Sequence, residues 1–219
     1  MSDELATLYE RRFSDAESAA KHALWGVICA HLQRYVDRGS TVLDVACDRG
    51  YFIENIDAAE KWATDVRDMS AHLSEGVRFV QGDGLMLDRH LPNDTFDVIF
   101  MSNYLEHLGS GDEVVEQFQV ARKLLRPGGK VLVLQPNIRL VGDAYWDFID
   151  HKVALTERSL AEAAEVAGLS TTHVITRFLP YTTKSRLPSS PRLARWYLTL
   201  RPAWYLLGKQ TLYQAERPA

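Results

Sequence analysis

The sequence predicts an α/β protein built on a mostly parallel sheet. Short runs of β-branched and apolar residues alternate with segments of helical periodicity along the chain, and the first of these runs ends in the tight turn Asp48-Arg49-Gly50. Strands that alternate with helices favour parallel pairing through right-handed crossovers. The 219 residues are 46% hydrophobic and 25% charged, a composition that excludes disordered, collagen-like and disulfide-stapled chains.

The N-terminal part predicts a helix that leads into the first strand. Apolar residues recur at helical spacing over residues 14–35, and Ser14 with Glu17 three positions later forms a capping-box pattern. A β-branched, apolar run over residues 41–46 predicts a buried strand. Residues 51–56 predict a short helix after the turn.

The rest of the chain supplies six further strands. The predicted strands cover residues 61–66, 77–81, 96–101, 130–135, 171–178 and 210–216, and the predicted helices cover 113–125 and 159–167. Gly168 is a glycine stop for the second of these helices. The stretch 179–208 is an insertion rich in Pro, Arg and aromatic residues, and its Ser190-Pro191 step suits the start of a helix.

Charge divides the chain into two unlike parts. The formal net charge is -4, yet no Asp or Glu occurs from residue 167 to residue 215, where seven Lys and Arg residues lie. The rest of the chain contains the other 18 basic residues and all 29 acidic ones, so it is strongly acidic. Nucleic-acid binding is disfavoured by this net charge and by the lack of a recognised binding module.

Localisation is expected to be cytoplasmic. The longest apolar runs are far shorter than the about 20 residues that span a bilayer, and the N-terminus has no basic region followed by an apolar stretch. The cysteines, Cys29 and Cys47, have neither a Cys-x-x-Cys partner nor a histidine at ligand spacing, so no metal is predicted.

The loop after the first strand carries the most informative motif. Ligands of open parallel sheets bind beyond the carboxyl ends of the strands, near the point where strand order reverses. The segment 42–52, Val-Leu-Asp-Val-Ala-Cys-Asp-Arg-Gly-Tyr-Phe, resembles the Asp-x-Gly-x-Gly-x-Gly loop of class I S-adenosylmethionine-dependent methyltransferases. Asp44 matches the acid of that loop and Gly50 its last glycine, whereas Ala46 and Asp48 replace the first two glycines. Aspartate is among the few residues other than glycine that visit the left-handed region at modest cost.

Four later motifs follow in the order of the same family. Asp65 ends the second strand, where the resemblance implies the carboxylate that accepts the ribose hydroxyls, with Val66 after it. Asp83 and Gly84 match the step that contacts adenine. Ser102 and Asn103 end the fourth strand, and the motifs Leu105-Glu106-His107-Leu108 and Arg126-Pro127-Gly128-Gly129 follow.

The resemblance implies a Rossmann-like class I methyltransferase fold. Such a fold has a mostly parallel seven-stranded sheet with an antiparallel last strand and helices on both faces. It also implies one methyltransferase domain over residues 1–219, in four parts: an N-terminal helical segment (1–38), a cofactor-binding core (39–178), a basic aromatic insertion or cap (179–208), and the last strand with the tail (209–219). The cofactor implied is S-adenosylmethionine, with S-adenosylhomocysteine as product.

A narrower resemblance extends over nearly the whole chain. Residues 135–139, 145–151, 156–160 and 178–181 look like a bacterial methyltransferase subgroup associated with cell-envelope polysaccharide pathways. The expected acceptor is therefore a small molecule or a glycan. This acceptor could carry a phosphate or a lipid. O-methylation is favoured over N-methylation.

Two histidines are candidates for a general base. A hydroxyl acceptor benefits from a base, and His107 and His151 lie in loops expected at the carboxyl edge of the sheet. Asp150 is the expected orienting partner of His151, and Asp147 and Tyr145 are candidates for binding acceptor hydroxyls. The alternative for each of these residues is a purely structural role in its loop.

The basic C-terminal stretch leaves three alternatives open. Leu193, Trp196, Tyr197 and Leu200 are at helical spacing with arginines nearby. The pattern suits an amphipathic helix on the inner membrane face, a cap whose arginines reach a phosphate on the acceptor, or a helix packed on the edge of the sheet. For the whole chain, the rival hypotheses are a non-catalytic relative in which Asp48 has weakened cofactor binding and, disfavoured by the loop spacing, a nicotinamide-dependent oxidoreductase.

Overall fold

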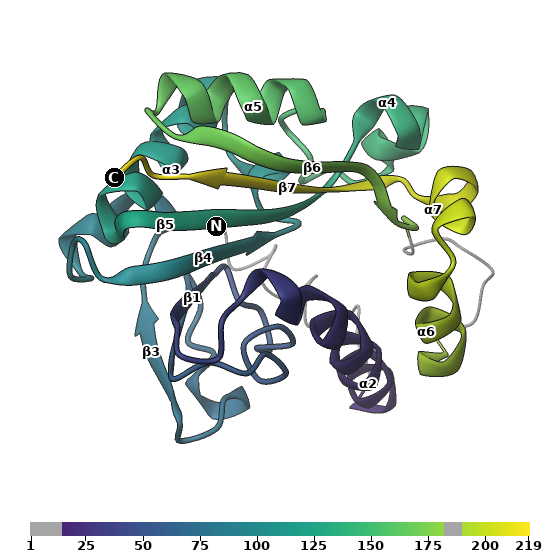
Figure 1. The fold of residues 1–219 in the computed structure, drawn as a ribbon, viewed down its shortest axis with the longest axis horizontal. Helices are drawn as coiled ribbons and strands as arrows, with labels where there is room; N and C mark the ends of the chain where they lie inside the picture. The colour runs from purple at the N-terminus through teal and green to yellow at the C-terminus, as the bar shows by residue number, and fades with distance from the viewer. Residues whose placement is uncertain (1–14, 182–189) are drawn as a thin grey trace.

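A computed structural model describes residues 15–181 and 190–219, and the side chains from Ala19 onward. Its centre is a seven-stranded sheet in the order β3-β2-β1-β4-β5-β7-β6 (Figure 1). The strands are β1 Thr41–Val45, β2 Glu60–Asp65, β3 Val77–Gln81, β4 Phe96–Ser102, β5 Leu125–Pro136, β6 Ser170–Leu179 and β7 Gln210–Glu216. The predicted strands and the predicted fold class are therefore confirmed.

Strand order reverses between β1 and β4. The chain runs outward through β1, β2 and β3 and then returns to place β4 on the other side of β1. The pairs of β1 with β2, β2 with β3, β1 with β4 and β4 with β5 are parallel, whereas β7 runs antiparallel to both of its neighbours. The carboxyl ends of β1 and β4 consequently meet at the switch point, where open sheets bind ligands.

Helices cover both faces of the sheet. The α-helices are α2 Asp15–Leu32, α3 Gly111–Leu124, α4 Ile138–Val141, α5 Glu157–Val166, α6 Pro191–Thr199 and α7 Arg201–Leu207, and the 3-10 helices are η1 Gln33–Tyr35, η2 Ser70–His72, η3 Gly84–Arg89, η4 Leu105–His107 and η5 Gly142–Asp147. Two separate apolar clusters form the core. One joins α3 and α5 to the sheet around Phe118 and Tyr213, and the other joins α2, α6 and α7 around Phe100 and Phe178.

The predicted helix over residues 51–56 is wrong. These residues form consecutive turns, in which the amides of Glu54 and Ile56 donate to the carbonyls of Gly50 and Phe52. Phe52, Ile53 and Ile56 are buried, so tertiary packing of a short apolar segment replaces a regular helix here. The Ser14 and Glu17 capping pattern lies outside the residues whose side chains are described.

The described parts of the insertion, residues 179–181 and 190–208, pack against the sheet and the N-terminal helix. The Tyr197 hydroxyl donates to the carbonyl of Phe178 in β6 (2.7 Å), and Trp204 Nε1 donates to the carbonyl of Tyr197 (2.8 Å). Leu198 and Trp204 are buried, whereas Leu193, Trp196 and Leu200 of the predicted apolar stripe are exposed. In Figure 1, α6 and α7 stand on the side of the molecule toward which the arrow of β4 points.

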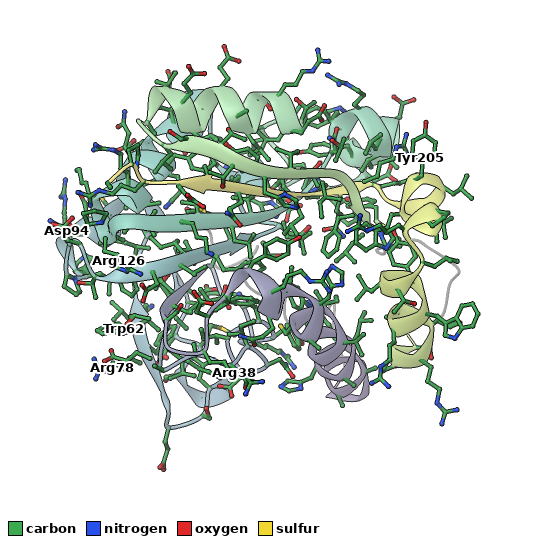
Figure 2. The ribbon with its side chains drawn as sticks, in the orientation of Figure 1. Arg38, Trp62, Arg78, Asp94, Arg126 and Tyr205 are labelled. Atoms are coloured by element: carbon green, nitrogen blue, oxygen red, sulfur yellow. The ribbon has the colours of Figure 1, made fainter. Side chains whose placement is uncertain are left out.

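Charged side chains at the opposite end of the sheet lie at the surface. Arg78 of β3 lies over the ring of Trp62 at 5.0 Å, and Arg126 pairs with Asp97 (Figure 2). None of the described helices is both long enough and apolar enough to cross a bilayer.

Candidate functional site

The loop after β1 keeps the backbone geometry that glycine favours. Ala46, Asp48 and Gly50 all have positive φ, at 55°, 49° and 71°. A Cβ on Gly50 would lie 2.3 Å from Leu73 Cδ2, so a side chain there would have to displace the end of Leu73 in addition to adopting a strained φ. The two departures from the glycine pattern therefore leave the shape of the loop intact, at a strain that Asp tolerates better than most residues.

Asp48 is held by two cations on other segments. Its carboxylate lies 3.5 Å from Lys21 Nζ on α2 and 3.2 Å from Arg67 Nη2, which follows β2. Burial lowers the pKa of Lys21, and the charge of Asp48 opposes that shift. The loop carboxylate is thus neutralised by residues that the sequence pattern did not mark.

Asp65 lies at the end of β2 and faces the same loop. Its oxygens accept from Arg67 Nε (3.0 Å), from Arg67 Nη2 (3.2 Å) and from the backbone amide of Asp48 (3.1 Å). The side chain is only 5% exposed. Val66 follows it and is half exposed, with its carbonyl accepting from Gln81 Nε2.

Asp44 lies beneath this network in β1. Burial raises its pKa well above the ordinary value, and the nearby charges of Asp65 and Asp48 raise it further, while a backbone hydrogen bond from Ile53 opposes them. Burial therefore disfavours the charged form of Asp44, while the charges of Asp48 and Asp65 are paired with Lys21 and Arg67.

The ends of β3 and β4 come to the same edge. Asp83 caps η3 by accepting from the amide of Leu85 (3.0 Å). A Cβ on Gly84 would lie 2.1 Å from the hydroxyl of Tyr104, which donates to Gln117 Oε1, so only glycine fits there. 

Ser102 and Asn103 end β4. Asn103 has a positive φ of 48°, and its Nδ2 lies 3.0 Å from Ser102 Oγ. The amide of Asn103 donates to the carbonyl of Leu134 in β5, which fixes the chain where it leaves the sheet. All ten residues predicted to bind the cofactor therefore lie on strands or loops at the switch-point edge, and their contact with cofactor stays a prediction.

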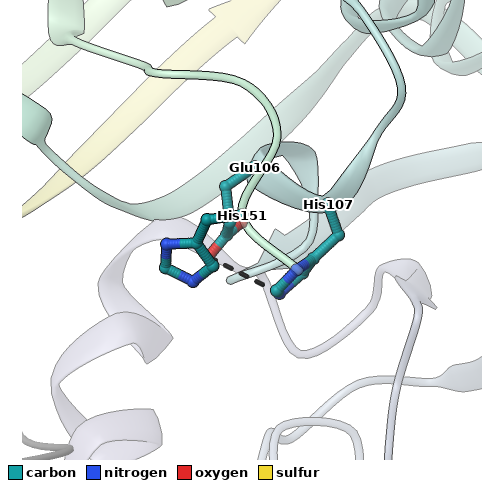
Figure 3. Close-up of side chains that lie close together, drawn as sticks. All are labelled: Glu106, His107 and His151. Atoms are coloured by element: carbon teal, nitrogen blue, oxygen red, sulfur yellow. Dashed lines mark ion pairs between the residues drawn. The ribbon is translucent and has the colours of Figure 1, made fainter. Parts of the chain in front are cut away.

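A second cluster joins the loop after β4 to the loop after η5. Glu106, His107 and His151 offer side-chain atoms that lie within 4.8 Å of one another (Figure 3). Glu106 is only 1% exposed, and Gln135 Nε2 of β5 donates to its Oε2 at 2.7 Å. His107 Nε2 lies 3.9 Å from Glu106 Oε1, along the dashed line of Figure 3. A buried carboxylate therefore stands beside two imidazoles.

His151 packs in an aromatic pocket. The centroid of its ring lies 4.8 Å from the ring centroid of Tyr145, 5.2 Å from that of Phe148 and 5.1 Å from that of His107. Burial lowers the pKa of His151, and the charge of Glu106 opposes this. The Nδ1 atom of His151 is buried.

Asp150 contacts His107, although the sequence paired it with His151. The carbonyl of Asp150 lies 3.0 Å from His107 Nδ1, and its carboxylate Oδ2 lies 3.7 Å from the same nitrogen. Since a carbonyl only accepts, this contact places a proton on Nδ1 and directs Nε2 toward Glu106. Asp150 therefore orients His107, and its charge also acts on His151, where it raises the pKa; its predicted role as the orienting partner of His151 stays a prediction.

Four residues of this edge were missed by sequence reasoning: Lys21, Arg67, Glu106 and Gln135. Glu106 adjoins His107 in the quoted Leu-Glu-His-Leu motif, a signal that could have marked it. Lys21 and Gln135 come from distant segments, and only the fold brings them to Asp48 and Glu106.

The Glu106, His107 and His151 group also offers a set of metal-ligand atoms. Tetrahedral zinc with ligands 2.0–2.1 Å away keeps them about 3.3 Å apart. The 3.9 Å between Glu106 Oε1 and His107 Nε2 is wider than that, and it is also longer than a direct hydrogen bond. Metal ligation and direct proton transfer between these two atoms would each need a small side-chain shift.

Comparison with known proteins identifies the family. A family model described as a methyltransferase domain matches residues 20–174. Comparison with curated proteins finds no match.

Solved structures share the fold across most of the chain. A SAM-dependent methyltransferase from Archaeoglobus fulgidus is 18% identical, with a TM-score of 0.62 over 88% of this chain and 94% of that one. A SAM-dependent methyltransferase of Thermotoga maritima, described as a possible histamine N-methyltransferase, is 15% identical, with a TM-score of 0.64 over 98% and 96%. A putative methyltransferase in complex with the Haloferax volcanii activator Trm112 is 16% identical, with a TM-score of 0.64 over 89% and 90%. The chain belongs to the methyltransferase-domain family, and it is a SAM-dependent methyltransferase with the Rossmann-like fold of that family.

Proposed function

We propose that the protein methylates a hydroxyl group of a small-molecule or glycan-type acceptor. The observation that carries this proposal is the Glu106, His107 and His151 cluster, which stands beyond the ends of β4 and β5. Transfer to a neutral hydroxyl benefits from a positioned base, and a neutral imidazole beside a buried carboxylate is such a base.

The switch-point edge fits S-adenosylmethionine. The loop of Ala46, Asp48 and Gly50 presents short side chains with positive φ, which lets a ligand approach the backbone. Asp65 would accept the ribose hydroxyls, and Asp83 with Gly84 would meet the adenine. Ser102 and Asn103 would face the reacting end. The bound cofactor supplies a methyl group activated on a sulfonium.

His151 is the proposed base. Its lowered pKa keeps the imidazole neutral near neutral pH, so Nε2 can take the acceptor proton as the new C–O bond forms. Glu106 stabilises the resulting imidazolium, and Gln135 holds the carboxylate in place. The rings of Tyr145 and Phe148 exclude water from the ring of His151.

A non-catalytic binding protein is the alternative. Asp48 stands in a glycine position, but it adopts the left-handed backbone and pairs with Lys21 and Arg67. These two observations favour cofactor binding over its loss. We further propose that the four parts of residues 1–219 act as one methyltransferase domain.

The test combines turnover with binding. We expect His151→Gln to lower methyl transfer at least about a hundredfold, measured as S-adenosylhomocysteine release with a panel of hydroxylated sugars. Its affinity for S-adenosylhomocysteine, measured by calorimetry, stays unchanged. His72→Gln, on an exposed 3-10 turn, is the matched control and keeps full turnover. Full activity of His151→Gln would refute the assigned base.

A further inference from the structure

A cavity separate from the methyl-transfer edge lies between α2 and the pair α6 and α7. Its volume is about 780 Å³, and apolar side chains, among them Val27, Leu198 and Trp204, form part of its wall. Volumes of roughly 300–1,000 Å³ are typical of small-molecule sites. The cavity therefore has room for a ligand with an apolar portion.

Three arginines line the same cavity: Arg34 from η1, Arg195 from α6 and Arg201 from α7. None of the residues that line it is acidic. Arg34 Nε donates to the carbonyl of His31, and its Nη2 lies 3.3 Å from His31 Nδ1. Among the described residues, Arg195 and Arg201 form no ion pair with an acid.

The pKa of His31 reflects its burial and the positive charge of two of these arginines. Burial, together with the charges of Arg34 and Arg201, lowers its pKa to about 4, and burial is the largest of these causes. The ring packs against Phe178 and Trp204, each with centroids 5.4 Å away. Three arginines and this imidazole therefore line one cavity.

Guanidinium groups without carboxylate partners match phosphate, which they bind through paired hydrogen bonds. Part of the cavity wall is apolar, and the helices α6 and α7 also carry exposed apolar side chains outside the lining, including Trp196 (74% exposed) and Leu206 (76% exposed). We propose that the cavity binds a phosphate or diphosphate ester whose remaining part is apolar. None of the described residues that line the cavity belongs to the proposed cofactor site or to the proposed base.

Calorimetry with inorganic pyrophosphate at low salt tests the anionic part. We expect binding to the full chain, weakened at least tenfold by the double variant Arg195→Gln and Arg201→Gln. Arg192→Gln is the matched control, because Arg192 lies exposed on α6 outside the cavity lining. Absence of heat at millimolar pyrophosphate in folded protein would overturn the proposal, as would an equal loss in Arg192→Gln.

A second arm distinguishes the source of the phosphate. A short-chain alkyl diphosphate should bind more tightly than pyrophosphate, because its chain covers the apolar wall. Equal affinity would overturn the apolar part of the proposal and identify a water-soluble phosphate as the occupant. Titration of the double variant with S-adenosylhomocysteine should give unchanged affinity, which separates failure at this cavity from failure at the cofactor site.

Discussion

The two ligand-binding regions handle charge in opposite ways. At the cofactor edge, Asp48 and Asp65 are matched by Lys21 and Arg67 in a connected network. In the cavity beside α6 and α7, Arg195 and Arg201 have no ion-pair partner among the described residues. The carboxylates Asp48 and Asp65 are paired at the cofactor edge, whereas the arginines Arg195 and Arg201 are not paired with acids among the described residues.

This difference separates a preorganised site from one that needs its ligand for charge balance. A bidentate Arg67 fixes Asp65 before any ligand arrives, which reduces the ordering that binding requires. Arginines without partners gain more from an anion than paired ones do, because no existing bond is lost. Each region is therefore expected to respond differently when one charge is removed.

The largest effect of removing one charge is expected at Asp65. Asp65→Asn should weaken binding of S-adenosylhomocysteine by about 1.5–3 kcal/mol, the scale of a hydrogen bond to a charged group, which is roughly a 10- to 150-fold change in Kd. Calorimetry measures the change. Asp68→Asn, on the exposed turn that follows, is the control and should leave Kd unaltered. Unchanged affinity in Asp65→Asn would remove its assignment to the ribose.

A smaller effect is expected on stability at the positive region. His31 has a pKa of about 4 in the folded protein, below its ordinary value near 6.5. Between these values the unfolded chain binds a proton that the native state excludes, so the free energy of unfolding falls as pH drops from 6.5 to 4, by on the order of 2 kcal/mol from this group. Urea unfolding at several pH values should show a flatter profile in His31→Asn. An equally steep profile in that variant would contradict the assignment.

No effect is expected from metal removal. If Glu106, His107 and His151 act in proton transfer, dialysis against a chelator should leave turnover unchanged. Loss of turnover that is restored by a divalent transition metal would instead identify the cluster as a metal site.

The fold could be predicted from the sequence because each strand end carries its own local signal. Asp44, Asp65 and Asp83 directly follow or end apolar runs, so periodicity and motif order place them without tertiary knowledge. The turns at residues 51–56 were missed because burial of Phe52, Ile53 and Ile56 decides their shape. Short apolar segments are governed by packing more than by helix propensity.

Pairings across the fold could not be predicted in the same way. Lys21 reaches Asp48 from α2, and Asp150 orients His107, because the tertiary fold sets both distances. The predicted apolar stripe of α6 faces outward at Leu193, Trp196 and Leu200, while Leu198 packs inward. Helical spacing identified the helix, but its orientation depends on α2 and β6.

The most direct test of the account is a titration of the folded protein with S-adenosylhomocysteine. The loop of Ala46, Asp48 and Gly50 keeps the left-handed geometry that close approach to its backbone requires. We therefore predict one binding site, with heat that saturates at micromolar ligand. No heat at high micromolar ligand, in protein shown to be folded by circular dichroism, would contradict the account.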